Sequence, residues 1–326
     1  MTPDTATAAA GPNIALIKYW GNRDDALRIP ANDSLSFTLS RLETRTRVTF
    51  SDDLAHDHLI INGLEASEVA RARVSAVLSH VRDLSGRRSF AQVESETNFP
   101  AAAGLASSAA AFAALSLAAS AAAGLDLPSR ELSLLARLGS GSAARSIFSG
   151  FALLHTGKDH QASFSEQLFP ASHWALIDLI AVVEAGSKSV GSSRGHQLAN
   201  TSPLQLARVQ DTPRRLETAR HAIAARDIEA LSSICELDSN MMHAVMMTSN
   251  PPLLYWSPGS IEIMHQIHTW RAAGDPVFFT VDAGPNVHCI TIPDCAEEIE
   301  ARLSGDPAVK EVLMAPMGEG ARLLPD

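Results

Sequence analysis

Short runs of alternating apolar and polar residues dominate the N-terminal part of the chain. An apolar run covers 14–20, and strand patterns follow at 34–40, 45–51 and 58–61. Asn62-Gly63, directly after the last of these, is typical of a tight hairpin turn. The later segments are predicted as a helix over 66–84, a strand over 90–96, an Ala-rich helix, and a helix opening at Pro128-Ser129 with Ser129 as its cap. These elements predict an α+β fold rather than a regular βαβ repeat.

Longer amphipathic stretches characterise the second half. Strand-like segments at 148–156 and 174–183 lead into predicted helices over 201–225 and 227–247. The remaining segments are a helix at 261–273, strands at 277–281 and 287–292, a helix at 296–303 and a strand at 309–316. This order resembles a split β-α-β unit. Because the pattern changes near 170–180, we predict two domains, 1–175 and 176–326.

Composition narrows the class of partner. The 326 residues are 46% hydrophobic and have a formal net charge of -10, which argues against nucleic acid or an anionic membrane and favours a small molecule. The first 13 residues lack the pattern of a secretion signal, so we expect a short frayed lead-in. Residues 101–125 hold no charge but are mostly alanine, which predicts a buried helix rather than a membrane span. The chain has three cysteines without metal-ligand spacing: Cys235, Cys289 and Cys295. We therefore expect neither a disulfide framework nor a zinc site, and we expect a reducing compartment, the cytoplasm.

The segment NFPAAAGLASSAAA, residues 98–111, is the first candidate for chemistry. A turn of small residues delivers Ser107 and Ser108 to the start of the Ala-rich helix. Free backbone N–H groups and the positive end of the helix dipole attract phosphate at such a start. The alternative is a tightly packed core helix after a Pro/Gly turn, and this segment alone leaves both interpretations open.

Two glycine-rich segments mimic nucleotide motifs. Gly139 to Ala144 fits G-x-G-x-x-A but follows a helical run, whereas a dinucleotide fingerprint follows a strand. Residues 186–193 have the glycine spacing of a P-loop but place Ser192 where the lysine belongs. We therefore expect neither site. Three histidines also lack metal-ligand spacing: His196, His243 and His288. We interpret each of them as structural or as adjacent to the substrate.

Arg145 and Asp282 are the charged residues that the motifs single out. Arg145 follows six small residues and needs an anionic partner, either in a structural ion pair or in a bound carboxylate or phosphate. The hydroxyls of Ser140 and Ser142 would assist in the second case. Asp282 ends a predicted strand, where it can close an Asx turn or orient a substrate hydroxyl.

Four segments together resemble the ATP-dependent mevalonate diphosphate decarboxylases, and the related phosphomevalonate decarboxylases, of the GHMP kinase superfamily. They are GPNIALIKYWGNRD at 11–24, ETNFPAAAGLASSAAAFAAL at 96–115, ARLGSGSAARSIFSGF at 136–151 and FTVDAGPN at 279–286. Weaker matches, PANDSLSFTLS at 30–40 and DSNMMHA at 238–244, extend the resemblance over nearly the whole chain. It implies an N-terminal domain like domain 2 of ribosomal protein S5, a ferredoxin-like C-terminal domain, and an active site between them.

The same resemblance implies ATP and Mg²⁺ as cofactors and assigns roles to residues. Asp282 is expected beside the tertiary 3-hydroxyl of mevalonate, and Arg145 is expected on the C1 carboxylate and the arriving phosphate. Lys18 and Asn13 would lie close to this centre. The nucleotide is expected on Pro100, Gly104, Leu105, Ala106, Ser107 and Ser108, with Ser108 also near Mg²⁺. The 5-phosphate end of the substrate is expected on Tyr19, Asn22, Ser140, Ser142, Lys188, Ser192, Arg194 and His196.

Two departures from the family pattern bear on the substrate. Family members that act on the diphosphate usually read KYWGKR, and this chain has Asn22 in place of the second lysine. The later loop, usually VSSxxGM, reads VGSSRGH here over 190–196. Fewer donors for a second phosphate favour mevalonate 5-phosphate as substrate and isopentenyl phosphate as product. Mevalonate 5-diphosphate is the alternative, because charge is still supplied by Lys18, Lys188, Arg23 and Arg194.

Two other classes of protein share parts of this pattern. One is a GHMP-type kinase that phosphorylates the 3-hydroxyl and stops, and the other is a non-catalytic relative that binds nucleotide. Arg145 argues against the kinase, since gripping a carboxylate is useful mainly when that carboxylate leaves. We also expect a homodimer, because that state is common among the proteins that the chain resembles.

Overall fold

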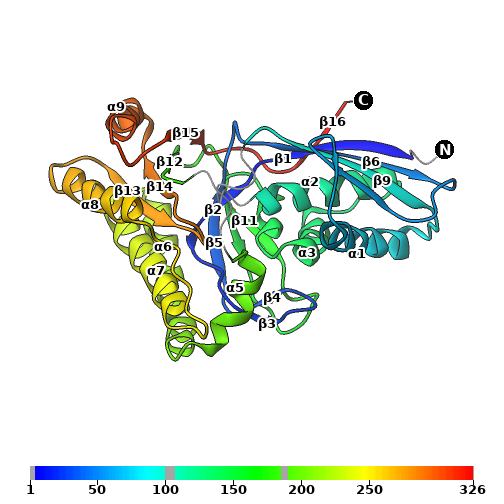
Figure 1. The fold of residues 1–326 in the computed structure, drawn as a ribbon, viewed down its shortest axis with the longest axis horizontal. Coiled ribbons are helices and arrows are strands. Elements are labelled where there is room, and N and C mark those ends of the chain that lie inside the picture. The colour runs from blue at the N-terminus through cyan, green and yellow to red at the C-terminus, as the bar shows by residue number, and fades with distance from the viewer. Residues whose placement is uncertain (1–3, 100–106, 185–189, 326) are drawn as a thin grey trace.

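The protein is described by a computed structural model over residues 4–99, 107–184 and 190–325. Within these residues, the strands form three larger sheets and a two-stranded ribbon, with helices packed against the sheets (Figure 1). The fold is α+β, which confirms the sequence prediction. In the same part of the chain, no helix combines the length and apolar character that a bilayer crossing requires.

The first sheet has six strands in the order β16-β1-β6-β9-β7-β8. Its strands are β1 (Thr5–Ala10), β6 (Thr44–Ser51), β7 (His58–Ile61), β8 (Leu64–Glu65), β9 (Phe90–Thr97) and β16 (Arg322–Leu324). β7 runs parallel to β9, and the other neighbours are antiparallel. Asn62 and Gly63 both have positive φ and connect β7 to β8, which confirms the predicted hairpin turn.

Strand β1 shows that the expectation of a frayed N-terminal lead-in was wrong. It pairs with β6 on one side and with β16, from the far end of the chain, on the other. Its alanines Ala8 and Ala10 are fully buried in the core that contains the Ala-rich helix α2 (Ser107–Ala122). Small side chains on both elements let the helix backbone lie close to the sheet.

Helices α1 (Glu68–Ser85), α2, α3 (Ser129–Gly139) and α4 (Ala143–Ser146) accompany this sheet (Figure 1). Ser67 caps α1 by accepting a hydrogen bond from the Ala70 N–H, and Gly86 ends the helix in a left-handed conformation. The expected Ser129 cap is wrong: Ser129 is already helical, and Pro128 precedes α3 without any side-chain cap. Because α3 ends at Gly139, the helical context that excluded a dinucleotide fingerprint is confirmed.

The second sheet has the order β11-β10-β5-β2 and is antiparallel. It comprises β2 (Asn13–Ile17), β5 (Ser34–Thr38), β10 (Phe151–Leu154) and β11 (Ser165–Phe169), and the ribbon comprises β3 (Asn22–Asp24) and β4 (Ile29–Pro30). All residues of β2, β5 and β10 are buried. Both faces of these three strands are therefore covered, whereas β11 at the edge of the sheet is partly exposed.

The third sheet has the order β13-β14-β12-β15 and is also antiparallel. Its strands are β12 (Ile177–Val182), β13 (Val277–Val281), β14 (Val287–Thr291) and β15 (Glu311–Pro316). β12 and β13 both run antiparallel to β14 between them, so they are parallel to each other and separated by one strand. This arrangement confirms the predicted split β-α-β unit.

One face of the third sheet packs with α8 (Pro258–Ala272) and α9 (Pro293–Ser304) in a core of their own. The other face joins a larger core with α6 (Gln205–Ala225), α7 (Ile228–Met247) and the second sheet. The short helix α5 (Ser192–Leu198), which is followed by the 3₁₀ turn Ala199–Thr201, lies beside the β3–β4 ribbon in the lower part of the view (Figure 1). The larger core thus contains residues from both sides of position 175, and the ends of β2 and β13 meet beside it.

Candidate active site

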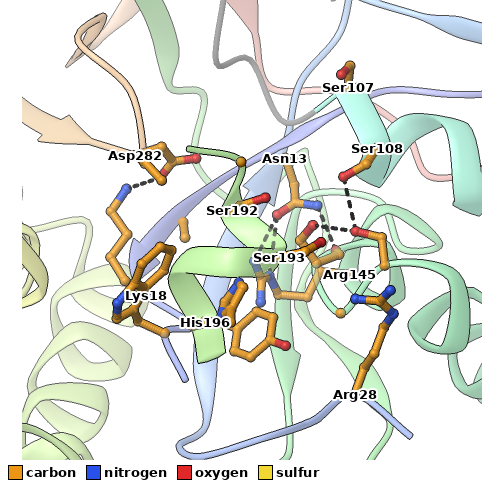
Figure 2. A pocket seen from close by; sticks show the side chains of 18 of the residues that line it. Asn13, Lys18, Arg28, Ser107, Ser108, Arg145, Ser192, Ser193, His196 and Asp282 are labelled. Atoms are coloured by element: carbon orange, nitrogen blue, oxygen red, sulfur yellow. Dashed lines mark hydrogen bonds and ion pairs between the residues drawn. The ribbon is translucent and has the colours of Figure 1, made fainter. Parts of the chain in front are cut away.

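A pocket of about 320 Å³ opens among segments that lie far apart in the sequence. Its walls come from the end of β2, the β3–β4 ribbon, the starts of α2 and α4, helix α5 and the turn after β13 (Figure 2). Eleven of the residues singled out from the sequence line it: Asn13, Lys18, Tyr19, Ser107, Ser108, Ser140, Ser142, Arg145, Ser192, His196 and Asp282. The fold therefore gathers four separate motifs into one cavity.

Lys18 and Asp282 form an ion pair at one end of the pocket. Lys18 follows β2, Asp282 follows β13, and the Lys18 Nζ lies 2.5 Å from Asp282 Oδ1 (Figure 2). The lysine side chain is 2% exposed, whereas the carboxylate is 25% exposed. The carboxylate is thus held in its place by a buried cation while still open to the cavity, as an acid group that contacts a ligand must be.

The backbone of Lys18 is fixed by a buried charge network beneath the pocket. Its N–H donates to Asp238 Oδ2 at 2.6 Å, and its carbonyl accepts from Arg208 at 2.8 Å. Arg215 Nε donates to the other oxygen of Asp238 at 2.8 Å. Asp238 lies in the DSNMMHA segment on α7, so this weakly matching motif supports the site from below.

Arg145 is buried at the centre of the pocket and is surrounded by neutral oxygens. Its guanidinium donates to Ser36 Oγ at 2.8 Å, to Asn13 Oδ1 at 3.1 Å, and to Ser34 Oγ. Among the described residues, no carboxylate lies within 4 Å of it, so the structural ion pair considered from the sequence is wrong. Burial lowers the pKa of Arg145 to about 10. An enclosed cation without a counter-ion favours an anionic ligand.

Asn13 and three serines continue the wall from Arg145 to the start of α2. Asn13 Nδ2 donates to the Ser142 carbonyl at 3.0 Å and to Ser146 Oγ at 2.8 Å. The hydroxyls of Ser108, Ser140 and Ser142 form a chain with spacings of 3.1 and 3.3 Å. Hydroxyls beside the N-terminal end of a 16-residue helix provide donors of the kind that bind phosphate oxygens.

Aromatic rings form the floor near α5. The His196 ring stacks on Tyr19 at 4.2 Å between centroids, and His196 Nδ1 accepts a hydrogen bond from the Gly21 N–H at 3.0 Å. Burial raises the pKa of Tyr19 above its usual range, so the phenol stays protonated and donates to Asn22 Oδ1. Gly141 must be glycine here, because a Cβ would lie 2.4 Å from the Tyr19 ring.

Arg28 and Arg73 also line the pocket, and the sequence analysis missed both. Arg28 lies in the turn between β3 and β4, and Arg73 lies on α1, four residues before the buried Val77. Each donates one hydrogen bond to a backbone carbonyl, Arg28 to Leu138 and Arg73 to Gly139. A cation within the apolar stripe of α1 was a usable signal for Arg73, whereas nothing in the sequence pattern marks Arg28.

Several predicted residues lie elsewhere. Asn22 is buried; its amide accepts a hydrogen bond from the Tyr19 hydroxyl and donates one to the Asp25 carboxylate at 2.6 Å. Arg194 is exposed and donates to Gln197. Neither is among the residues lining the pocket. Five further predictions fall outside the described residues: Pro100, Gly104, Leu105, Ala106 and Lys188.

The remaining histidines have structural surroundings. His288 on β14 is paired with Asp178 on β12 at 2.7 Å, within the third sheet. His243 is buried on α7, and its Nε2 lies 3.2 Å from the Val281 carbonyl, just before Asp282. Burial lowers the pKa of His243 to about 4, so the ring is neutral at neutral pH and donates to that carbonyl.

A second, largely apolar pocket adjoins the first. The two share Arg73, Ser107 and Ser108, and the second continues between β7, β9, α1 and α2 over apolar side chains such as Leu59 and Phe112. Its volume is about 200 Å³. An elongated ligand with one apolar and one anionic part fits such a pair of cavities.

No cluster of three or more metal-ligating side chains exists within the described ranges. Any divalent cation in the pocket would therefore rely on few protein oxygens together with ligand phosphates, which is the usual manner of Mg²⁺ binding. Ser108 Oγ, at the start of α2, lines this pocket.

Comparison with known proteins matches both halves of the chain. Residues 10–165 match the diphosphomevalonate decarboxylase-like N-terminal domain, and residues 178–312 match the mevalonate 5-diphosphate decarboxylase C-terminal domain. Diphosphomevalonate decarboxylase of Homo sapiens is 36% identical, with 97% of this chain and 86% of that protein covered. The enzyme of Saccharomyces cerevisiae is 37% identical, with 88% and 77% covered.

Solved structures extend the similarity to three dimensions. Mevalonate diphosphate decarboxylase of Enterococcus faecalis superimposes with a TM-score of 0.91 at 37% identity over 98% of both chains. The Staphylococcus aureus enzyme gives 0.92 at 35% identity over 99% of this chain and 98% of that one. A structure of MDDEF in complex with MVAPP, AMPPCP and magnesium gives 0.92 at 38% identity over 98% of both chains.

Proposed function

The chain belongs to the diphosphomevalonate decarboxylase family of the GHMP superfamily and is an ATP-dependent decarboxylase of a phosphorylated mevalonate; we propose that its substrate is mevalonate 5-diphosphate. The products would be isopentenyl diphosphate, CO₂, ADP and phosphate. The observation that carries the decarboxylation site is the buried Arg145, which has no carboxylate of the described residues within 4 Å, in the same pocket as the Lys18–Asp282 pair. A substrate whose carboxylate is attached to the carbon next to the one that bears the hydroxyl fits these two sites.

In this proposal Arg145 binds the C1 carboxylate and Asp282 contacts the 3-hydroxyl. Arg145 is already oriented by Ser34, Ser36 and Asn13, so little side-chain entropy is lost when the carboxylate binds. Asp282 is oriented by Lys18, which the Asp238 network holds in turn. The phosphorylated end of the substrate extends toward Ser140, Ser142 and Ser192.

The proposed reaction activates a poor leaving group and then expels it. The 3-hydroxyl oxygen attacks the γ-phosphorus of ATP, its proton passes to Asp282, and ADP leaves. The C3–O bond then breaks and phosphate takes the electron pair. The electrons of the C1–C2 bond form the C2=C3 double bond, and CO₂ is released. The Asp282 carboxylate also favours positive charge as it develops at C3.

The nucleotide side of the site fits ATP with Mg²⁺. The second pocket offers an apolar site for a base, and Ser107 and Ser108 join it to the reacting centre. Ser108 would be the protein oxygen for Mg²⁺, which when bound neutralises charge on the transferring phosphoryl group. The segment 100–106, expected to contribute backbone N–H groups, lies outside the described residues.

Mevalonate 5-phosphate is the second candidate substrate and was the first choice from the sequence. One observation favours it: residue 22 is an asparagine that is closed by Tyr19 and Asp25 and offers no cation. The comparisons favour the diphosphate, because the relatives above are named for that substrate. Arg28, which the sequence analysis missed, also adds a pocket cation.

A paired-substrate assay tests the proposal. We expect a kcat/KM for mevalonate 5-diphosphate at least tenfold above that for mevalonate 5-phosphate, with one CO₂ released per ADP formed. The reverse preference would refute the diphosphate assignment and support the monophosphate. ADP without CO₂ would refute decarboxylation and favour a 3-kinase.

Two variants separate the roles of Asp282 and Arg145. Asp282→Asn is nearly isosteric, so we expect a fall in kcat of about 100-fold or more while ATP still binds. Arg145→Lys keeps a positive charge but loses the planar fork, so we expect loss of kcat/KM for the mevalonate substrate. Normal turnover by Asp282→Asn would contradict its role.

A further inference from the structure

Arg28 and Arg73 are the two pocket cations to which the proposed reaction assigns no step. Four cationic side chains line the pocket in the described part of the chain: Lys18, Arg28, Arg73 and Arg145. Lys18 is paired with Asp282, and Arg145 is enclosed by oxygens that orient it. Arg28 reaches only a backbone carbonyl, and no carboxylate of the described residues lies within 4 Å of it.

The backbone of Arg28 directs its side chain into the pocket. Arg28 has a positive φ of 49° in the tight turn that precedes β4, a conformation that most side chains disfavour. Its Nε donates to the Leu138 carbonyl at 3.0 Å, next to the Gly139–Ser142 segment of the wall. This bond fixes the plane of the guanidinium and leaves both terminal amino groups for a ligand. Figure 2 shows Arg28 rising into the pocket on the side away from Lys18 and Asp282.

The neighbouring position on the same ribbon does not compete with Arg28. Asn22 on β3 accepts from the Tyr19 hydroxyl and donates to Asp25, so both ends of its amide are occupied. Arg23, which the sequence suggested as a source of charge for a diphosphate, is instead exposed, donates to the Gly157 carbonyl and is not among the residues that line the pocket. Of the β3–β4 ribbon and the turn within it, only Arg28 is among the residues that line the pocket.

Arg28 contributes to the main pocket and not to the apolar second pocket. Arg73 lines both the main pocket and the apolar second pocket, whereas Arg28 lines the main pocket alone. The proximity of Arg28 contributes to lowering the pKa of Arg73, after burial as the larger cause, to about 10. Two cations at this end of the cavity, neither of them in an ion pair with a carboxylate of the described residues, make an anionic ligand group favourable there.

We propose that Arg28 binds the terminal phosphate of the substrate and so determines the preference for a diphosphate over a monophosphate. The inference rests on the proposed function, because it takes the 5-phosphorylated end of mevalonate as the ligand. A monophosphate ends nearer Ser140 and Ser142, whereas a second phosphate extends the chain toward the ribbon. The guanidinium then forms charge-assisted hydrogen bonds with the outer phosphate only.

Arg28→Gln tests the proposal, with Arg23→Gln as its matched control. The control removes the same charge from the same ribbon at a position outside the pocket. Dissociation constants for mevalonate 5-diphosphate, mevalonate 5-phosphate and ATP are measured by calorimetry, and KM and kcat are measured for both mevalonates. For Arg28→Gln we expect the Kd of the diphosphate to rise about 10- to 100-fold, with changes below threefold for the monophosphate and for ATP. Arg23→Gln should leave all three within twofold of the wild type.

Arg28→Lys distinguishes the charge from the structural bond to Leu138. Lysine retains the cation but not the Nε hydrogen bond, so a phosphate role predicts that most of the lost diphosphate affinity returns. Equal losses in Arg28→Lys and Arg28→Gln, or equal weakening of both mevalonates and ATP, would overturn the proposal and assign Arg28 to the wall structure alone. A wild type that binds the diphosphate through Arg28 without releasing CO₂ would refute the proposed function and leave this inference standing.

Discussion

At the scale of single residues, the partners of a buried arginine indicate whether its charge serves the fold or the binding of a ligand. Arg208 and Arg215 are fully buried and share the carboxylate of Asp238, so their charge is neutralised within the protein. Arg145 is equally buried, but its hydrogen bonds go to neutral oxygens, and no carboxylate in the described part of the chain lies within 4 Å of it. Keeping such a cation costs folding free energy, and that cost is offset when an anionic ligand binds.

Asp238→Asn tests the structural half of this contrast. The substitution removes the carboxylate that Arg208 and Arg215 share and leaves Arg215 with the half-exposed Asp211 alone, so we expect the free energy of unfolding to fall by about 3 to 5 kcal/mol. Asp211→Asn is the matched control, since Asp211 contacts the same Arg215 from a half-exposed position and should cost below about 1 kcal/mol. Urea denaturation of both variants gives the comparison. Equal losses would show that burial of the carboxylate is unimportant.

His243 predicts a pH dependence of stability. Its pKa is about 4 in the folded protein against an ordinary 6.5, because burial disfavours the charged ring. The unfolded state therefore binds more protons between these values, and stability falls as pH decreases from 6.5 toward 4, by up to about 1.4 kcal/mol per pH unit. Above pH 6.5 both states are neutral at this residue and it contributes no slope.

The comparison for His243 is His243→Gln, whose amide can still donate to the Val281 carbonyl without titrating. We expect its free energy of unfolding to depend on pH less steeply than that of the wild type between pH 6.5 and 4.5. Identical slopes for the two proteins would contradict the buried neutral histidine.

Predictability from sequence differs between residues of the same pocket. Arg145, Asp282 and Lys18 stand in distinctive motifs, so their approach to one pocket could be expected from the resemblance alone. Arg28 carries no such mark, because its role depends on a left-handed backbone turn and on a carbonyl about a hundred residues later. Residue type and spacing do not predict this contact between Arg28 and the Leu138 carbonyl.

At the scale of elements, the helices were easier to predict than the strands that lack an alternating apolar pattern. Helices α1, α6 and α7 end within a few residues of their predicted limits because their apolar periodicity is local. β1 consists of Thr and Ala and has no such pattern; it is a strand because β6 and β16 pair with it. β11 and the short helices α4 and α5 were also missed, since their few residues are fixed by contacts with distant segments.

Gly195→Ala tests how α5 is fixed against the pocket. Gly195 faces Trp20, and a Cβ would lie 2.4 Å from the Trp20 ring, so the helix must shift to admit it. We expect a loss of about 1 to 3 kcal/mol of stability from overpacking and a rise in KM for the mevalonate substrate, because Ser192 and His196 move with the helix. Gly305→Ala is the control, since its Cβ would meet only ordinary contacts of 3.5 Å or more. An unchanged KM in Gly195→Ala would show that α5 does not position the substrate.

At the scale of the whole molecule, the site lies where two sequence-predicted domains share one core. That core joins Leu16 and Phe37 of the second sheet to Leu231 on α7 and Phe278 on β13. The Lys18–Asp282 pair crosses the same junction, and β16 returns the C-terminal end of the chain to the first sheet. The division into 1–175 and 176–326 stays a prediction: each part has one core made mainly of its own residues, and the larger core is shared between them.

A chain of 326 residues with two domains ordinarily unfolds in separate steps, but this shared core predicts one transition. We expect a single calorimetric peak in which ATP and the mevalonate substrate each raise the same midpoint. Leu231→Ala in the shared core and Ile299→Ala in the core beneath α9 should each lower that one midpoint, since a buried Leu or Ile to Ala change costs about 2 to 5 kcal/mol. Two resolved peaks in the wild type, of which Ile299→Ala moves only one, would show that the halves fold independently. The active site would then depend on docking between them rather than on a common core.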